Sequence, residues 1–259
     1  MPNVPLPVLL YHRVDDTGGE YATTPAVFRS HLAWLAERGY RTLSTADLDR
    51  ALDDPNTPLP ARSVMLTFDD GFDCLDREVA PALREYGFTA AAFLITGRSD
   101  ETDRFERPED QLSWASARRL ATEGVLEFHT HTHTHGTWPR TAASADAVAD
   151  DLARSRSLLA EHLGRPESAF THVAWPYGRS HPSWEARAER LGLRTQYSVQ
   201  RGAIDRRDRT RRLPRLLTDG MSTSALACWM ATLSRPAGAR AANVVFGTIR
   251  QARQGTAYR

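Results

Sequence analysis

The sequence alternates short runs of aliphatic, aromatic and β-branched residues with longer stretches whose apolar residues recur three and four positions apart. Runs of the first kind are typical of buried strands, and the second spacing is typical of amphipathic helices. Strands that alternate with helices predict an α/β fold with a mostly parallel sheet or barrel. The seven candidate strands are "PVLLYH" (7–12), "SVMLTF" (63–68), "TAAAFLI" (89–95), "VLEF" (125–128), "HVAW" (172–175), "TQYSV" (195–199) and "RLPRLL" (212–217).

The candidate helices lie between these strands. They cover residues 25–38, 45–51, 78–86, 113–122, 143–162 and 182–191. No linker rich in proline, serine or glycine divides the chain, so seven strands favour one barrel over two smaller domains. We therefore predict one catalytic barrel over residues 1–233. The segment 234–259 holds five arginines and no acidic residue, and it is predicted to be a helix or a loose tail.

The charge balance argues against a surface dedicated to nucleic acid. The chain has 33 basic and 32 acidic residues, a formal net charge of +1, and every basic residue is arginine. Seven of the arginines lie between Arg201 and Arg215, but Asp205 and Asp208 interrupt the run and no aromatic residue lies within it. This pattern favours a solvated loop, so no nucleic-acid partner is predicted. The absence of lysine excludes Schiff-base chemistry.

Membrane and export signals are also missing from the sequence pattern. No window approaches the roughly 18 apolar residues that a membrane span requires. The start, "MPNVPLPVLLYHRV", has no basic segment ahead of its short apolar run and no small-residue cleavage site behind it. The sequence as given therefore predicts a cytoplasmic protein without a membrane span.

Two carboxylates follow the candidate strand at residues 63–68. In "MLTFDDGFD", Asp69 and Asp70 come directly after the apolar run, and Gly71 permits a sharp turn. Barrels of alternating strands and helices place their active sites at this edge. Adjacent carboxylates point in different directions, so one can bind a metal while the other serves as a base. The alternative is a capping role for the next helix, which is the commoner role of an isolated "DDG".

Four histidines alternate with threonines in "EFHTHTHTHG", directly after the candidate strand "VLEF". Catalytic zinc-type sites take three ligands from histidine and carboxylate side chains and leave a position open. Histidines four apart on a helical turn point the same way, and both His129/His133 and His131/His135 have this spacing. If the strand continued instead, its period of two would place all four imidazoles on one face without a defined pocket.

Two further segments could contribute to a site. In "AWPYG", Trp175, Pro176 and Tyr177 form a rigid aromatic corner that could pack in the core or line a sugar-binding wall. The strand "VLLYH" ends in His12, and a lone histidine in such a place more often has a structural role than a catalytic one.

In combination, "TFDDG", "EFHTHTHTH" and "WPYG" resemble the motifs of the polysaccharide deacetylase family, the NodB-homology or carbohydrate esterase 4 group. The resemblance spans residues 7–217. "VLLYHRV" and "RRLPRLL" are most similar to the branch that deacetylates poly-β-1,6-N-acetylglucosamine. The resemblance implies an α/β fold, a distorted (β/α)7 barrel of the NodB-homology type, and the "YHR"-like start implies a circularly permuted one. It also implies a metal-dependent hydrolase that removes N-acetyl groups from N-acetylated amino sugars.

The resemblance implies a metal site of one aspartate and two histidines. Matching the glutamate-x-x-Ser/Thr-His-Thr-x-x-His block of the family places the ligands at Asp70, His131 and His135. The alternation leaves a shift of two open, which would make His129 and His133 the ligands. Zinc is the expected cofactor of such a ligand set, with cobalt, nickel or iron as alternatives.

The resemblance also implies the groups that transfer protons. Asp69 is the expected catalytic base, His12 the expected general acid, and the backbone N–H of Tyr177 the expected oxyanion donor. The family commonly carries an arginine before the Pro-Tyr-Gly unit, and here alanine and tryptophan precede it. We expect Arg215 of "LPR" to replace that arginine from another strand. The expected substrate-binding residues are Trp175, Pro176 and Tyr177.

Two other functions remain open at this point. One is a hydrolase of a small non-sugar amide on the same fold, and the other is a catalytically inactive barrel that only binds glycan. The aspartate pair, the spaced histidines and a plausible acid favour an enzyme that acts on an N-acetylated sugar.

Overall fold

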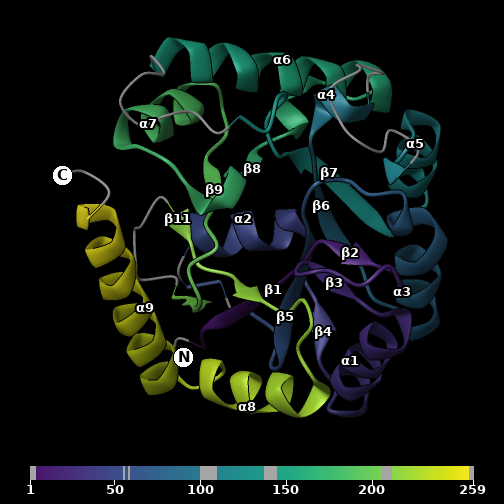
Figure 1. The fold of residues 1–259 in the computed structure, drawn as a ribbon, viewed down its shortest axis with the longest axis vertical. Helices are drawn as coiled ribbons and strands as arrows, with labels where there is room; N and C mark the ends of the chain where they lie inside the picture. The colour runs from purple at the N-terminus through teal and green to yellow at the C-terminus, as the bar shows by residue number, and fades with distance from the viewer. Residues whose placement is uncertain are drawn as a thin grey trace.

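The structure is a computed structural model, and it describes residues 4–54, 56–57, 59–99, 110–136, 145–205 and 212–256, with residue 99 and the last ten described by their backbone only. Strands form a ring that helices surround (Figure 1). In order across the sheet they are β10 (Ala203–Ile204), β1 (Leu6–Tyr11), β5 (Ser63–Phe68), β6 (Ala90–Leu94), β7 (Leu126–Thr130), β8 (His172–Ala174), β9 (Thr195–Tyr197) and β11 (Arg212–Leu213). Neighbours from β1 to β11 are parallel, and β10 is antiparallel to β1.

The predicted strand at 212–217 is in fact two short strands that nearly close the ring. β11 pairs with β9, while β12 (Leu216–Leu217) pairs with β1. Pro214 between them has no N–H to donate to a ladder, and the N–H of Arg215 bonds to the carbonyl of Gln200 instead. The segment therefore connects the last strand to the first. The predicted distorted α/β barrel is confirmed.

All six predicted helices are present, two further helices at residues 96–99 and 223–233 were not predicted, and most of the helices cover the outside of the ring. The helices are α1 (Pro25–Glu37), α2 (Thr45–Asp53), the π-helical turn η1 (Leu75–Val79) with α3 (Ala80–Tyr86), α4 (Thr96–Ser99), α5 (Trp114–Thr122), α6 (Ala145–Leu163), α7 (Pro182–Arg190), α8 (Thr223–Leu233) and α9 (Pro236–Thr256). Short elements are β2 (Arg13–Val14), β3 (Ala22–Thr23), β4 (Arg41–Thr42), η3 (Glu167–Ala169) and η4 (Pro176–Gly178). Side-chain caps fix several starts, such as Ser44 and Asp47 in a capping box at α2.

Both faces of the sheet are buried, and successive residues of a strand alternate between the outer and the inner face. Alternate residues of β5, Val64, Leu66 and Phe68, belong to a large cluster that also contains residues of α1, α3, α5 and α8. The residues between them point to the inside of the ring. The inner cluster is Leu6, Val8, Leu43, Leu48, Met65, Ala91, Phe93, Ala174, Tyr197, Ile204 and Leu213. Because the period is two, Asp69 follows the inward-pointing set.

Helix α2 occupies the end of the ring where the strands begin. Its Asp49 accepts a hydrogen bond of 2.8 Å from the hydroxyl of Thr195, the first residue of β9. The same carboxylate lies 3.1 Å from Nε2 of His172, the first residue of β8. The opposite end, at the carboxyl ends of the strands, is therefore the one available for a site.

The segment that follows residue 233 contains α9, which packs against α8 and β10. Ala239 and Ala242 of α9 are buried in the outer core. The division of the chain at residue 233 stays a prediction.

In the part of the chain that the structure describes, no helix is long and apolar enough to cross a membrane.

Candidate metal and catalytic site

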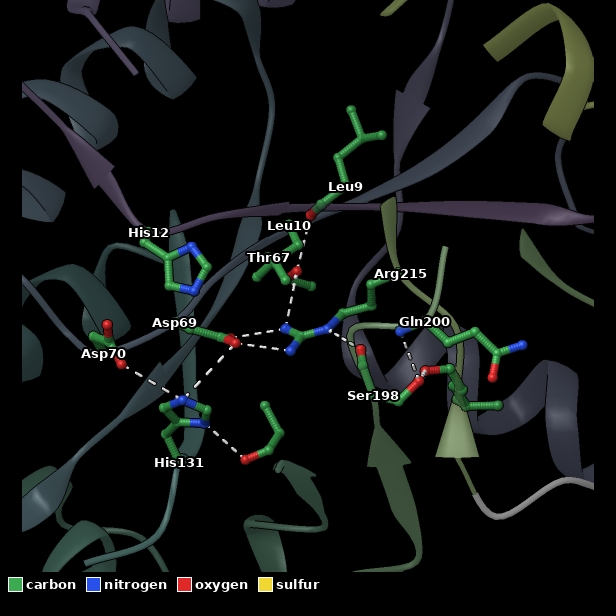
Figure 2. A network of polar contacts seen from close by, with 12 residues as sticks. Leu9, Leu10, His12, Thr67, Asp69, Asp70, His131, Ser198, Gln200 and Arg215 are labelled. Atoms are coloured by element: carbon green, nitrogen blue, oxygen red, sulfur yellow. Dashed lines mark hydrogen bonds and ion pairs between the residues drawn. The ribbon is translucent and has the colours of Figure 1, made fainter. Parts of the chain in front are cut away.

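The carboxyl ends of three strands bring the predicted polar residues together. Asp69 follows β5, His12 follows β1, and His131 follows β7. The N–H of Asp69 donates to the carbonyl of Tyr11 at 3.0 Å, which extends the pairing of β1 and β5 up to the site. Figure 2 shows the imidazoles and carboxylates converging at this edge.

Asp70, His131 and His135 form a group whose ligand atoms all lie within 4.8 Å of one another. The Nε2 atoms of both histidines lie 3.5 Å from Oδ1 of Asp70. This oxygen is buried and has no hydrogen-bond partner among the described residues. A buried carboxylate oxygen without a hydrogen-bond partner is unfavourable, and a cation bound between it and the two imidazole nitrogens would satisfy it.

The state of both imidazoles suits a metal ion. Nδ1 of His131 donates to the carbonyl of Ala174 at 2.7 Å, which leaves the lone pair of Nε2 directed toward Asp70. Burial, with a smaller contribution from His131, lowers the pKa of His135 to about 3, so this ring is neutral near pH 7. Neutral imidazoles and one carboxylate are the donors of an open divalent metal site, and the three residues therefore fit the expected ion.

The two ligand histidines lie on a loop that follows β7, so neither the helical turn nor the continued strand considered from the sequence is present. Thr132 has a φ of 72° and His135 a φ of 51°, both in the left-handed region. The N–H of His135 donates to the hydroxyl of Thr132 at 3.0 Å. Left-handed residues other than glycine cost about 1–3 kcal/mol each, so surrounding contacts must hold this loop.

The other two histidines of the tract lie away from Asp70. His129 is one layer deeper in the barrel, with Nε2 3.2 Å from the hydroxyl of Thr45 and its ring 4.7 Å from that of His172. His133 places Nδ1 3.1 Å from the hydroxyl of Thr96. The geometry thus favours the register that uses His131 and His135.

Asp69 forms a bidentate ion pair with Arg215 inside the barrel. Both hydrogen bonds measure 2.7 Å, and both side chains are buried (Figure 2). Burial alone would raise the pKa of Asp69, but the charge of Arg215 and its hydrogen bonds lower it to about 2. Asp69 is therefore an oriented carboxylate with no proton near neutral pH.

Contacts from three directions hold the guanidinium of Arg215. Its Nε donates to the carbonyl of Ser198 at 3.0 Å, and the rings of Phe93 and Tyr197 lie on it with centroids at 5.6 Å. The structure thus places Arg215 where the sequence predicted a replacement for the missing motif arginine. In the same arginine-rich run, Arg212 pairs with Glu185, and residues 206–211 lie outside the described residues.

Asp219 contributes to the site and was missed in the sequence. Its Oδ2 lies 2.6 Å from Nδ1 of His12, and its Oδ1 accepts from the N–H of His12 at 3.1 Å. Burial would lower the pKa of His12, but this hydrogen bond and the charges of Asp69, Asp219 and Asp70 raise it. The sequence does contain a signal for this residue. Asp219 comes just after the strand segment 212–217, much as Asp69 comes just after the strand segment 63–68.

The aromatic corner has two buried residues and one exposed residue. Trp175 is fully buried, and its Nε1 donates to Oε1 of Gln196, so its side chain belongs to the core and the expectation of a sugar wall is wrong for it. Pro176 is also buried. Tyr177 has a φ of 54°, is 54% exposed and lies with its ring 5.0 Å from that of His135. Gly178 is required behind it, since a Cβ there would lie 2.6 Å from the backbone of Val199.

Known proteins are similar to this chain in both sequence and fold. The chain is 27% identical over 232 residues to YxkH of Bacillus subtilis, a protein named for the polysaccharide deacetylases. The aligned region covers 88% of this chain and 77% of that one. It is 24% identical over 203 residues to the poly-β-1,6-N-acetyl-D-glucosamine N-deacetylase of Staphylococcus aureus, covering 76% and 68%.

Solved structures superpose over most of the chain. The Streptococcus pyogenes deacetylase PplD has a TM-score of 0.77 at 23% identity, covering 90% of this chain and 100% of that one. IcaB from Ammonifex degensii has a TM-score of 0.74 at 25% identity, covering 87% and 97%. The sequence profile of the polysaccharide deacetylases matches residues 56–196, more than half of the chain, including the segments that carry Asp70, His131 and His135. The chain therefore belongs to the polysaccharide deacetylase family.

Proposed function

We propose that this protein is a metal-dependent hydrolase that removes N-acetyl groups from N-acetylated amino sugars. The observation that carries the proposal is the buried Oδ1 of Asp70, which faces Nε2 of His131 and of His135 at 3.5 Å with no other hydrogen-bond partner among the described residues. The proposed base, Asp69, is held by Arg215 and lies on one side of this group. The proposed acid, His12, is held by Asp219 and comes from a third strand.

A divalent ion bound by Asp70, His131 and His135 would lower the pKa of a water molecule and polarise the amide carbonyl. Asp69 accepts the proton of the attacking water, and its pairing with Arg215 keeps the carboxylate ionised and oriented. The backbone N–H of Tyr177 donates to the oxyanion. His12 has Nδ1 engaged by Asp219, so Nε2 is the atom that protonates the leaving amine.

We propose oligomers of β-1,6-linked N-acetylglucosamine as the substrate. Support comes from the S. aureus relative with that named activity, which aligns over 203 residues, and from the exposed ring of Tyr177 beside His135. An exposed aromatic ring at the rim of a polar site offers a flat apolar surface for a sugar.

Removal of the metal is expected to abolish acetate release. The protein is treated with a chelator, dialysed and assayed for acetate from N-acetylglucosamine oligomers, and zinc or cobalt is then added back. Because the cation supplies both the activated water and the polarised carbonyl, activity should return with about one metal equivalent. Metal content is measured in the same samples.

The same assay separates the proposal from its alternatives. Acetate from the oligomers but not from small N-acetyl compounds supports a glycan substrate. Release only from small non-sugar amides would assign the protein to the other hydrolase class. Oligomer binding without release in the metal-loaded protein would identify a glycan-binding barrel.

Replacing Asp219 with Asn is expected to move the basic limb of the pH profile to lower pH. His12 must be protonated to act as an acid, and its pKa lies above the ordinary value because its hydrogen bond to Asp219, together with the charges of Asp69, Asp219 and Asp70, outweighs burial. Asparagine keeps the shape but removes the charge, so the pKa of His12 should fall and activity should be lost at lower pH. The profile of kcat/KM measures the shift. Coincident basic limbs in the two proteins would contradict the assignment of His12.

A further inference from the structure

One face of α6 holds the loop that carries the histidine ligands. Asp151 and Ser155 are four residues apart, so they project from the same side of the helix. The hydroxyl of Ser155 lies 2.6 Å from that of Thr130, the last residue of β7. One turn earlier, Asp151 contacts the loop itself. The helix thus fixes both the end of the strand and the segment that follows it.

Asp151 accepts three hydrogen bonds from two consecutive loop residues. Oδ1 accepts from the N–H of His133 at 2.7 Å, and Oδ2 accepts from the N–H and the hydroxyl of Thr134 at 3.1 and 2.7 Å. Both residues lie between the ligands His131 and His135. A single carboxylate therefore fixes the middle of the loop.

Helix α4 holds the same loop from the other side. The N–H of Gly97 donates to the carbonyl of His133 at 2.9 Å, and the hydroxyl of Thr96 lies 3.1 Å from Nδ1 of that residue. A Cβ at position 97 would lie 2.6 Å from the His133 carbonyl, so the close approach requires glycine. His133, which does not ligate, is therefore held through its N–H, its carbonyl and its ring.

We infer that Asp151 is a positioning residue that sets the metal affinity of the site. The loop contains two left-handed residues, Thr132 and His135, and the second must direct Nε2 toward Asp70. Without the three bonds to Asp151, the loop could relax toward ordinary backbone angles and withdraw His135. Partners beyond the ligands commonly control affinity in this way. The inference rests on the proposed function only in assuming that the site binds a divalent ion.

The test measures zinc affinity in Asp151→Asn, with Asp150→Asn as the matched control. The asparagine side chain would offer one acceptor oxygen in place of two, whereas Asp150 is the adjacent, exposed residue of the same helix. Competition with a chromophoric chelator gives the dissociation constant. We expect about a 10- to 100-fold weaker affinity for Asp151→Asn and an unchanged value for the control. The visible absorption of the cobalt-loaded protein should also change, since it reports ligand geometry.

A second pair of variants keeps the test decisive if Asp151→Asn does not fold. Thr134→Val removes one of the three bonds, and Thr134→Ser retains it. The valine variant should bind zinc more weakly than the serine variant. Turnover of Asp151→Asn should recover as free zinc is raised, which a general loss of packing would not allow.

Equal zinc affinities in the wild type, Asp151→Asn and Asp150→Asn would overturn the inference. A wild-type protein that binds zinc but releases no acetate would defeat the proposed function and leave this affinity test intact. A wild-type protein with no zinc affinity would defeat both.

Discussion

Replacing Asp69 with Asn is expected to lower turnover by about 10²- to 10⁴-fold, the usual contribution of a positioned base. Asparagine has nearly the same shape but cannot accept the proton of the attacking water. Asp70, His131 and His135 are unchanged, so the variant should keep its metal. Acetate release per bound zinc, measured with saturating oligomer, gives the size of the effect.

The control for this variant must account for Arg215, because the neutral asparagine leaves a buried guanidinium without its anionic partner. A thermal unfolding curve shows whether the protein is folded at the assay temperature. A folded, zinc-loaded Asp69→Asn protein with wild-type turnover would show that another group is the base.

The sequence predicts the fold well because its signals are local. Seven apolar runs and six helical patterns identify most of the elements, although α8 was not predicted, and the apolar run in "SVMLTFDD" correctly indicates that Asp69 follows a buried strand at its carboxyl end. The error in the last strand has a local cause as well. Pro214 divides the segment 212–217, so each half pairs with a different neighbour.

The histidine tract could not be resolved from its own pattern. A repeat of two residues is unchanged by a shift of two, so spacing cannot distinguish His131 and His135 from His129 and His133. What distinguishes them is where β7 ends and the left-handed turn at Thr132 begins. Neither follows from propensity, since a β-branched residue in that conformation depends on tertiary contacts.

The residues that tune the site lie outside the most recognisable part of the sequence. His12, Arg215 and Asp219 all fall beyond the family match at residues 56–196. They reach the site because β1 lies between β12 and β5, which brings the segments that follow β1 and flank β12 to the same edge of the barrel as Asp69. Trp175 is the reverse case. It lies within a family motif and was expected to bind sugar, but its side chain is buried in the core.

Replacing Arg215 with Met is expected to destabilise the metal-free protein by about 3–5 kcal/mol at pH 7, because it leaves the carboxylate of Asp69 buried without a partner. In the wild type, Arg215 is the largest influence that opposes burial and holds the pKa of Asp69 at about 2, below its ordinary 3.8. The stabilisation is therefore fully present above pH 3.8 and is lost as the pH falls toward 2. Without Arg215, burial should raise that pKa and favour a protonated Asp69. The difference in unfolding free energy between the two proteins should accordingly shrink at acidic pH, as urea titrations can measure.

Adding Asp69→Asn to Arg215→Met removes the unpaired charge, so the double variant should regain most of the lost stability but no turnover. Equal stability of the single and double variants would show that the loss arises from packing and not from an unpaired carboxylate.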